Sequence, residues 1–556
     1  MAQPVPPPGS PLPGIVPRTS TVVAPPSTAT APVAPAPVNP EITVSIRDVT
    51  IEGATAYAPG VLEALTTGLT GDAVPAQKIE AARAAILNRY RADGYVYTTV
   101  NARIRAGQLR FVVTEGRIVD VKLDGDIGPA GTQVLRFLRH LTEVRPIDTR
   151  SLERWLLLAG DIPGVTITST LNPSTDDPGA LTLVATVRRD KYSGQISADN
   201  RAFRQTGPEE LLTQFDLNSV TSFGERTEVS LYHTFNDTET FGQLSGEFFL
   251  GGSGLKLKIY GGAGETTPSG SLGALGYDGI TRVGGLQLSY PLIRSRQQTL
   301  NLVGAFDVIE SEILTNTGAN GQAIKSSFDS LRVLRAGADY SIYDVWLGPA
   351  FAATSDATFR LSQGLLILGA SPNGDVTAPR LHEQVDFTKV SGEIDRTQSL
   401  FSPFKSAEVS LKLAAEGQYS GDILPPEEKF YLGGPHFNRG FYYGEVTGDS
   451  ALAVTFEPLL DVNFTTLESL PAWIGPLPLS AQFYSFYDWG NAWQNQSTDA
   501  NYVLRSVGGG LRFYIGPRVE MDVEGVSRLT RTPDGEPPEV SRLKSSAVYW
   551  QILGRF

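Results

Sequence analysis

The residues best suited to specific chemistry lie in one short stretch, residues 430–445, which reads FYLGGPHFNRGFYYGE. Aromatic side chains, glycines and His436 surround a single arginine, Arg439, between segments that alternate like β-strands. Glycines allow a chain to turn and to approach a neighbouring surface closely, and a guanidinium makes two-point contacts with carboxylates. The stretch therefore suits packing and charge pairing, and its role depends on the elements around it.

No constellation typical of catalysis or metal binding accompanies this stretch. The sequence has no G-x-S-x-G elbow, no phosphate-binding loop and no H-E-x-x-H motif. It has no cysteine and only four histidines, so neither disulfides nor cysteine or histidine metal sites are expected. The acidic pairs Asp176–Asp177 and Glu209–Glu210 are interpreted as loop or rim charges, and His436 as a packing or hydrogen-bonding residue. We expect no enzyme activity, no catalytic residue, no cofactor and no metal.

Composition limits the class of protein further. The net charge of −13 and the pI near 5.0 argue against electrostatic binding of nucleic acid. The mean hydropathy is −0.10, and the sequence has no apolar run of the ~20 residues that a transmembrane helix needs. A β-barrel crosses a membrane with apolar residues at every second position, which composition does not reveal. The first residues show no signal peptide, which leaves either a cytoplasmic protein or the mature form of an exported chain, and the second is favoured.

The N-terminal third divides into a tail and two similar units. Residues 1–42 are rich in Pro, Ala, Thr and Ser with almost no charge, which is typical of a flexible tail. Residues 43–116 have the order β-α-α-β-β, with Ile79, Ala82, Ile86 and Tyr90 on one helical face. Residues 117–190 repeat that order. We therefore predict two tandem α+β domains.

Residues 191–556 lose the helical period and alternate in strand after strand. The segment at 255–260 sets Leu255, Leu257 and Ile259 against Lys256, Lys258 and Tyr260. A soluble β-sandwich or propeller is the alternative, but the polar faces carry full charges and no propeller period is present. At ~23 residues per strand and connection, the region holds roughly sixteen strands. The pattern favours a membrane β-barrel of about 16 antiparallel strands.

The last strand adds to this interpretation. The segment AVYWQILGRF places Val548, Trp550, Ile552, Gly554 and Phe556 on one face. It resembles the closing strand of outer-membrane barrels, whose outward residues and final aromatic are read by the assembly machinery. Trp550, Ile552, Gly554 and Phe556 are therefore candidates for an assembly signal.

Several motifs together resemble one family. The segments NRYRADGYVYTTVNARI and VTEGRIVDVKLDG are similar to POTRA domains. The stretch at 430–445 resembles the family's sixth extracellular loop, with Leu432, Gly433 and Gly434 followed by Asn438, Arg439, Gly440 and Phe441, where Asn438 replaces the usual valine. FYDWG is similar to its F-x-D-x-G strand motif, at Phe486, Asp488 and Gly490. Two POTRA-like units before one such barrel resemble the TpsB transporters of two-partner secretion, the hemolysin secretion/activation family.

This resemblance implies a site and a function. The arginine loop would fold back into the barrel, where Arg439 would meet Asp488 on an inner strand face. An unpaired, partly desolvated arginine is costly, and lysine cannot copy its two-point contact. The tail shows no amphipathic stretch like the plug helix of some members, so a helical plug is not expected.

The expected role is export of one partner across a Gram-negative outer membrane. The POTRA domains, in the periplasm, would recognise a TpsA-type exoprotein (an adhesin, hemolysin or toxin), and the barrel would conduct it without nucleotide hydrolysis. Outer-membrane lipid and the barrel-assembly machinery are the other expected partners, and nucleic acid is not one. A barrel-assembly insertase of the same superfamily and a passive porin remain the alternatives.

Overall fold

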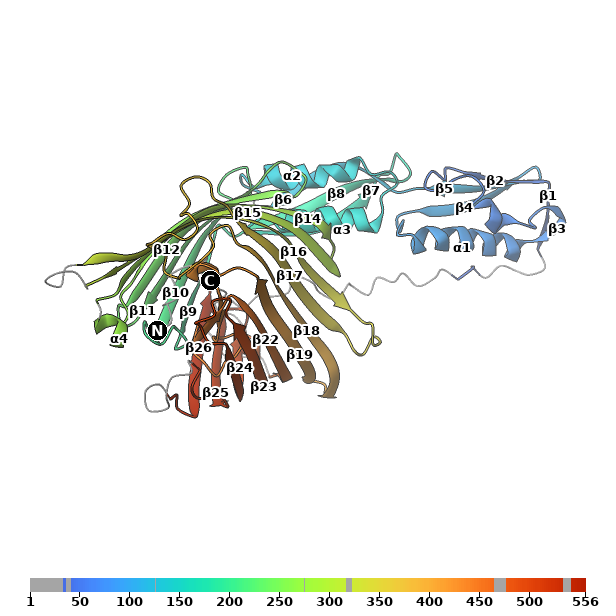
Figure 1. Ribbon diagram of the computed structural model, residues 1–556. Helices are drawn as coiled ribbons and strands as arrows, with labels where there is room; N and C mark the ends of the chain where they lie inside the picture. The colour runs from blue at the N-terminus through green and yellow to red at the C-terminus, as the bar shows by residue number, and fades with distance from the viewer. Residues whose placement is uncertain are drawn as a thin grey trace.

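The computed structural model describes residues 34–36, 42–125, 127–274, 276–316, 323–464, 477–533 and 542–556. The predicted tail, residues 1–42, lies almost entirely outside these ranges. Figure 1 shows an elongated molecule in which two small α+β units lead into a large barrel. Among the described residues, no helix is long and apolar enough to cross a membrane.

The first unit packs helix α1 (Ala76–Ala92) against a small sheet. The helix buries Ile79, Ala82, Ile86 and Tyr90 as predicted, and Gly94 follows it with φ +93°. A three-stranded sheet has the order β2-β5-β4, and β1 pairs with β3. The other elements are β1 (Thr43–Ile46), β2 (Asp48–Glu52), η1 (Glu63–Thr66), β3 (Gly71–Pro75), β4 (Thr99–Arg105) and β5 (Gln108–Thr114).

The second unit has the predicted order of elements. Helix α3 (Thr149–Gly160) begins where the Asp148 side chain accepts a hydrogen bond from the Ser151 N–H at 2.9 Å. Its sheet has the order β6-β8-β7. The remaining elements are β6 (Arg117–Gly125), α2 (Gly131–Leu138), η2 (Arg139–Thr142), β7 (Val165–Pro173) and β8 (Ala180–Arg189).

Sixteen antiparallel strands close into one barrel, which confirms the predicted fold class. The first strand, β9, pairs with the last, β26. The strands are β9 (Tyr192–Asp199), β10 (Glu210–Asn218), β11 (Arg226–Thr234), β12 (Glu239–Phe249), β13 (Lys256–Thr266), β14 (Asp278–Arg294), β15 (Gln298–Thr315), β16 (Ile324–Asp344), β17 (Ala353–Gly364), β18 (Thr388–Phe404), β19 (Ala407–Ser420), β22 (Ser450–Asn463), β23 (Leu479–Trp493), β24 (Tyr502–Ile515), β25 (Val519–Arg528) and β26 (Ser546–Arg555). A short helix, α4 (Gly270–Ala274), lies between β13 and β14.

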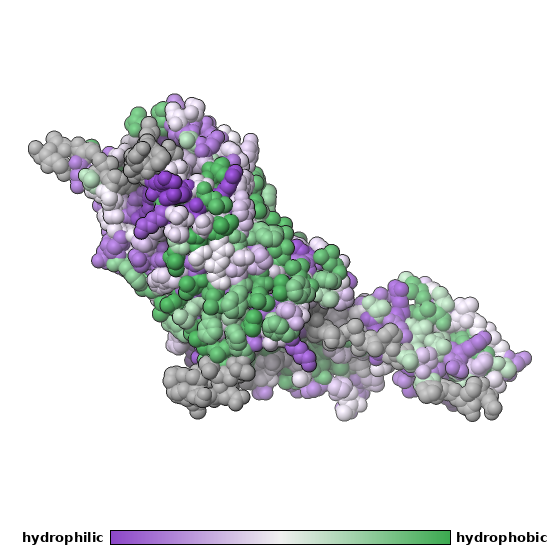
Figure 2. Space-filling model, turned by 90° about the horizontal axis from the view of Figure 1, so that it is seen from below, coloured by the Kyte–Doolittle hydropathy of each residue, from purple (hydrophilic) through white to green (hydrophobic). Residues whose placement is uncertain are grey.

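The two-residue period determines which way the barrel faces. Exposed side chains on the outer wall are apolar, as at Ile259, Phe359 and Ile394, whereas buried charged residues such as Asp216 and Asp307 face inward. Figure 2 shows hydrophobic residues gathered over much of the barrel wall on the face that is seen. An apolar outside and a polar inside are typical of a membrane barrel.

The second unit is joined to the barrel through side chains as well as through the chain itself. Phe249, at the end of β12, lies in the hydrophobic core of the second unit, 5.2 Å from the Phe137 ring. Arg294, at the end of β14, forms an ion pair with Asp161 at 2.7 Å. The second unit is thus held directly against the barrel end at which β9 begins.

Candidate functional site

The predicted arginine stretch belongs to loop 6, residues 421–449, which connects β19 to β22 and folds into the barrel. Loop 6 contains a short helix, η4 (Pro426–Glu428), and a hairpin of β20 (Phe430–Leu432) and β21 (Val446–Gly448). Its apolar residues form a core with the inner wall of β22, β23 and β24. Buried members of this core are Leu432, Phe437, Phe441, Val446, Ala453, Ala492 and Leu504. The aromatic residues of the stretch therefore pack loop 6 against the lumenal wall.

Close approach explains the glycines on both sides of this contact. A Cβ on Gly440 would lie 2.5 Å from the Cβ of Ser506 on β24, and a Cβ on Gly490 would lie 2.2 Å from Asn438 Oδ1. Either contact would force the loop away from the wall. Gly433 and Gly434 follow β20, and the Gly434 N–H donates to the Phe441 carbonyl at 3.2 Å.

Asn438 has a structural reason to differ from the valine of the resembling motif. Its backbone is left-handed, with φ +54°, a conformation that asparagine tolerates and β-branched residues resist. Its Nδ2 also donates to the Leu504 carbonyl at 3.2 Å. Asn438 thus fixes the turn that presents Arg439.

The structure places Arg439 against Asp488. The Arg439 Nε and Nη2 donate to Asp488 Oδ2 and Oδ1 at 3.2 and 3.1 Å, and the Arg439 backbone N–H donates to Oδ2 at 2.8 Å. The Arg439 guanidinium also lies 3.7 Å from the centre of the Phe486 ring. Arg439 is 2 % exposed and Asp488 is fully buried. This is the two-point geometry in which arginine outperforms lysine.

A second carboxylate also contacts the Arg439 guanidinium. Glu457 on β22 accepts from Arg439 Nη1 at 2.9 Å and lies 3.2 Å from Arg512 Nη1. Thr455 donates its hydroxyl to Asp488 at 2.9 Å. Burial acts to lower the pKa of Arg439, but the attraction of Asp488 and Glu457 outweighs burial and raises it. Arg439, Asp488, Glu457 and Arg512 therefore form one charge cluster inside the barrel, in which Arg512 also pairs with Asp522 at 3.1 Å.

The backbone of the motif is held by side chains at the barrel seam, from β25, β26 and the segment after β9. The carbonyl of Arg439 accepts a hydrogen bond from Arg201 Nη1 at 2.8 Å. The carbonyl of Gly440 accepts from Arg528 Nε at 2.5 Å and from the Tyr549 hydroxyl at 3.2 Å. The sequence interpretation missed Glu457 and these donors, which differ little from other lumenal charges on alternating strands.

The candidate assembly residues lie apart from loop 6 on β26. Ile552 and Phe556 are exposed on the outer surface, whereas the alternate residue Leu553 is buried. Phe556 exchanges two backbone hydrogen bonds of 3.0 Å with Gly194 on β9. The Trp550 backbone N–H donates to Asn200 Oδ1 at 2.9 Å. Trp550, Ile552, Gly554 and Phe556 thus share one face of the strand that closes the barrel.

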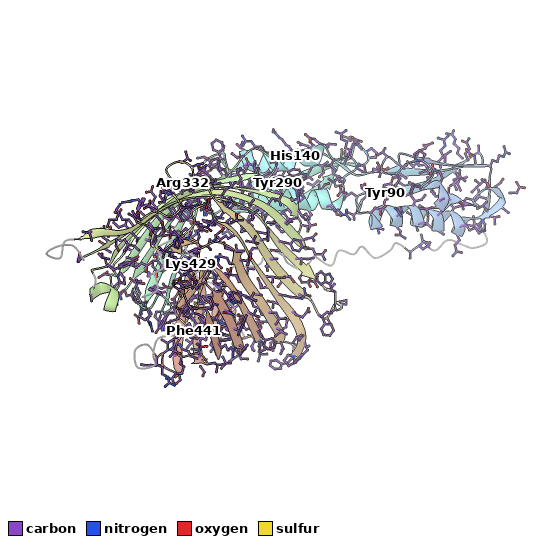
Figure 3. All side chains as sticks on the ribbon, in the orientation of Figure 1. Tyr90, His140, Tyr290, Arg332, Lys429 and Phe441 are labelled. Carbon is purple, nitrogen blue, oxygen red and sulfur yellow. The ribbon has the colours of Figure 1, made fainter. Side chains whose placement is uncertain are left out.

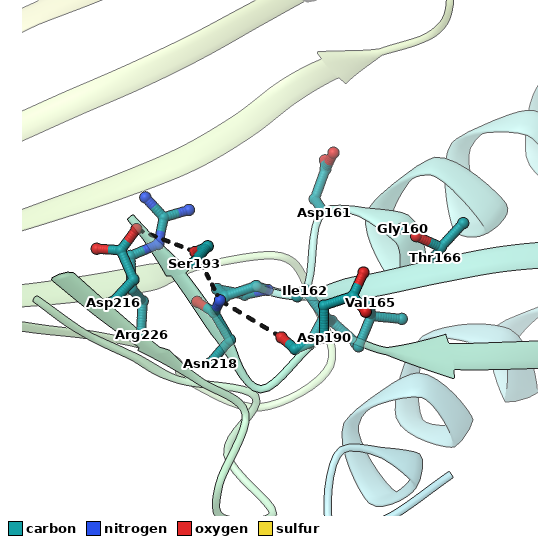
Figure 4. A pocket seen from close by; sticks show the side chains of 12 residues that line it. Gly160, Asp161, Ile162, Val165, Thr166, Asp190, Ser193, Asp216, Asn218 and Arg226 are labelled. Carbon is teal, nitrogen blue, oxygen red and sulfur yellow. Dashed lines mark hydrogen bonds between the residues drawn. The ribbon is translucent and has the colours of Figure 1, made fainter. Parts of the chain in front are cut away.

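A cavity of about 410 Å³ lies where the second unit meets the first barrel strands (Figure 4). Asn218 Nδ2 donates to Ser193 Oγ at 2.9 Å, and Ser193 donates to Asp216 at 3.2 Å. Small-molecule sites are lined mainly by apolar side chains, whereas most of the side chains that line this cavity are polar, with Ile162 and Val165 among the few apolar ones. In the described part of the chain, no group of three or more histidine or acidic residues is arranged to hold a metal ion.

These features define a class of protein, a membrane β-barrel whose lumen holds an inward-folded loop and which follows two POTRA-like α+β units. Residues 181–513 match the family described as haemolysin secretion/activation protein ShlB/FhaC/HecB. Residues 44–116 match the ShlB-type POTRA domain. The chain belongs to this family, the TpsB transporters of two-partner secretion.

Individual relatives agree with this assignment. The heme/hemopexin transporter protein HuxB of Haemophilus influenzae (strain 86-028NP) is 21% identical over 416 residues, which cover 74% of this chain and 69% of HuxB. CdiB from Escherichia coli has a TM-score of 0.69 at 17% identity, over 97% of this chain and 94% of CdiB. CdiB from Acinetobacter baumannii has a TM-score of 0.62 at 17% identity, over 93% and 91% of the two chains. The structures show that the fold is shared.

Proposed function

We propose that the chain exports one large secreted exoprotein through its barrel without nucleotide hydrolysis. The family indicates transport of a partner protein by an outer-membrane barrel, and we place its POTRA domains in the periplasm. The observation that carries the finer proposal is the Arg439–Asp488 contact. This contact holds loop 6 inside the lumen through which the exported chain would pass. Residues Leu432 to Phe441 and the wall motif Phe486, Asp488 and Gly490 then act together to position loop 6.

Capture of the partner is assigned to the POTRA domains. Strands β2 and β4 form the edges of the first three-stranded sheet, and β6 and β7 form those of the second. An edge strand has unpaired backbone groups that can hydrogen-bond an extended, unfolded chain. This mode requires no enzymatic site, in line with the non-enzymatic role of a transporter barrel.

The outer wall and the last strand carry two further roles. The apolar outer residues contact outer-membrane lipid, as in other membrane barrels. The outward face of β26, with Trp550, Ile552, Gly554 and Phe556, is proposed to be recognised by the barrel-assembly machinery. Both roles are separate from the lumenal contact of loop 6.

Deletion of the gene in its native host tests the function. We expect the culture medium to lose one large protein while the other outer-membrane barrels keep their normal amounts. Complementation with the full chain should restore that protein, whereas a variant lacking residues 43–116 should insert without restoring it. Loss of many barrels would instead indicate an insertase, and an unchanged secretome would indicate a passive porin.

A further inference from the structure

Loop 6 makes a second buried contact with the barrel wall, at the end of η4. Glu428 is 1 % exposed, and its carboxylate is bound by Arg335 of β16 through two hydrogen bonds of 2.6 and 3.1 Å. Lys389 of β18 lies at 2.5 Å from the same carboxylate. Nothing in the 430–445 motif includes these residues, so this contact is separate from the Arg439 contact.

The wall is built to receive this glutamate. Asp307 of β15 accepts from Arg335 Nε at 2.6 Å, and Ser362 of β17 accepts from Arg335 Nη1 at 3.0 Å. The Glu428 carbonyl accepts from Lys389 Nζ at 2.8 Å and from Gln418 Nε2 at 2.9 Å. Five neighbouring strands, β15 to β19, therefore contribute to one binding pocket for a single loop residue.

Charge balance indicates that the pocket is incomplete without Glu428. Arg335 and Lys389 carry two positive charges, and Asp307 carries one negative charge. Burial acts to raise the pKa of Glu428, but attraction by Arg335 and Lys389 outweighs burial and lowers it to about 2. Removing the loop would leave one uncompensated cation in the wall, and a buried charge without a partner is costly.

The two loop contacts have opposite polarity and different places on the wall. At Arg439 the loop supplies the cation and the wall supplies carboxylates, whereas at Glu428 the loop supplies the carboxylate and the wall supplies cations. The order of strands puts β17, β18, β19 and β22 between Arg335 on β16 and Asp488 on β23. Figure 3 places Lys429, next to Glu428, in the interior between the two walls and Phe441 against the C-terminal strands.

We propose that Glu428 is a second anchor of loop 6, a positioning residue that holds the loop as a brace between two sides of the lumen. The inference rests on the proposed function, in which loop 6 occupies the route of the exported chain. The opposite polarity fixes the direction of the loop, because exchanging its two ends would place like charges together. Glu428 keeps the Arg439 end in register, and export requires release of one or both anchors.

Cysteine labelling tests this anchor independently of export, because the native chain contains no cysteine. Thr447 pairs with Tyr431 near Glu428 and is 2 % exposed, so Thr447→Cys reports release of this end of loop 6. The purified barrel in detergent is treated with a bulky maleimide, and E428Q is compared with the same protein carrying Glu428. The matched control is D339N, which breaks the Asp339–Arg360 pair between β16 and β17 without touching loop 6.

We expect E428Q to speed labelling at least tenfold, with D339N within twofold of the reference. The K389Q change should have a smaller effect, and the E428Q/K389Q double variant should label no faster than E428Q alone, because coupled residues are not additive. If E428Q gives no folded barrel, R335K replaces it, since lysine keeps the charge but loses the two-point contact.

The anchor would be overturned if E428Q or R335K labelled within twofold of the reference. It would also be overturned if D339N labelled as fast as E428Q. Secretion is measured separately. If E428Q speeds labelling as expected but no strain, including the wild type, secretes a partner, the proposed export function is refuted and the second anchor still stands.

Discussion

Truncation of Arg439 gives the sharpest test of the lumenal contact. In Arg439→Ala, the fully buried Asp488 loses both guanidinium hydrogen bonds and keeps two others, from the backbone N–H of residue 439 at 2.8 Å and from the Thr455 hydroxyl at 2.9 Å. Glu457 keeps Arg512 at 3.2 Å, so the main cost falls on Asp488. Removing one partner of a buried ion pair costs about 3–5 kcal/mol. Since ~1.4 kcal/mol is tenfold, the ratio of docked to undocked loop should fall by roughly a hundred-fold to several thousand-fold.

The lysine variant refines this magnitude. Arg439→Lys keeps the positive charge near Asp488 but offers a compact ammonium in place of the planar fork. The loss of one charge-assisted hydrogen bond costs about 1.5–3 kcal/mol, so the lysine variant should fall between wild type and alanine. A graded series of this kind distinguishes a two-point contact from a general requirement for positive charge.

Ser506 provides a suitable probe of docking at this end of the loop. Ser506 is fully buried, and its hydroxyl accepts a hydrogen bond from the Gly440 N–H at 3.2 Å. In a Ser506→Cys background, Arg439→Ala should speed maleimide labelling by at least tenfold, while the wall variant Arg360→Ala should not. Secretion of the partner, normalised to folded barrel, should fall in parallel. Labelling at the wild-type rate, or effects of Arg439→Ala and Asp488→Ala that multiply in the double variant, would refute the contact as a determinant of loop position.

Three further predictions concern other parts of the chain. Phe556→Ala should lower the amount of folded barrel in the outer membrane more than the export activity per folded molecule, as measured by heat-modifiable gel migration, because Phe556 lies on the outer face of the closing strand. Deletion of residues 43–116 should leave barrel insertion intact and abolish secretion, and export at the normal rate would exclude capture by the first POTRA domain. Burial, together with repulsion from Glu383, raises the pKa of Glu427 to about 7, above its usual ~4.3, so protonation stabilises the docked loop and this contribution is lost as pH rises through 7. Single-channel recordings should therefore show more frequent opening above pH 7, and Glu427→Gln should abolish that pH dependence.

Most of the architecture could be predicted from the local periodicity of apolar residues in the sequence. The face formed by Ile79, Ile86 and Tyr90 predicted α1, because a helix that packs on a sheet must repeat its apolar residues every three to four positions. The two-residue alternation predicted the barrel and, with chain length, its sixteen strands. Both signals are visible because neighbours in sequence remain neighbours in the element.

The charge network of the lumen could not be predicted from a local pattern in the sequence. Arg201 lies far from Arg439 in sequence, and only closure of the barrel brings the Arg201 guanidinium to the Arg439 carbonyl. Glu428 stands in a Pro-Glu-Glu run that has the composition of an exposed loop, yet it is 1 % exposed. Asp488 was suggested by its motif, whereas Glu457 is one of many charges on lumenal strand faces. Long-range pairing therefore has to be obtained from the fold.

In the proposed function, the two anchors would hold loop 6 firmly and would still be released without nucleotide. Each anchor is a compensated cluster, in which loop charges replace the water that would otherwise solvate the wall. The cost of separating a buried ion pair comes mainly from leaving the charges desolvated, so water that enters with a polar, unfolded chain lowers that cost. In this proposal, the exported chain would promote release of loop 6 by hydrating the Glu428 and Arg439 clusters, and the clusters would re-form when the lumen empties.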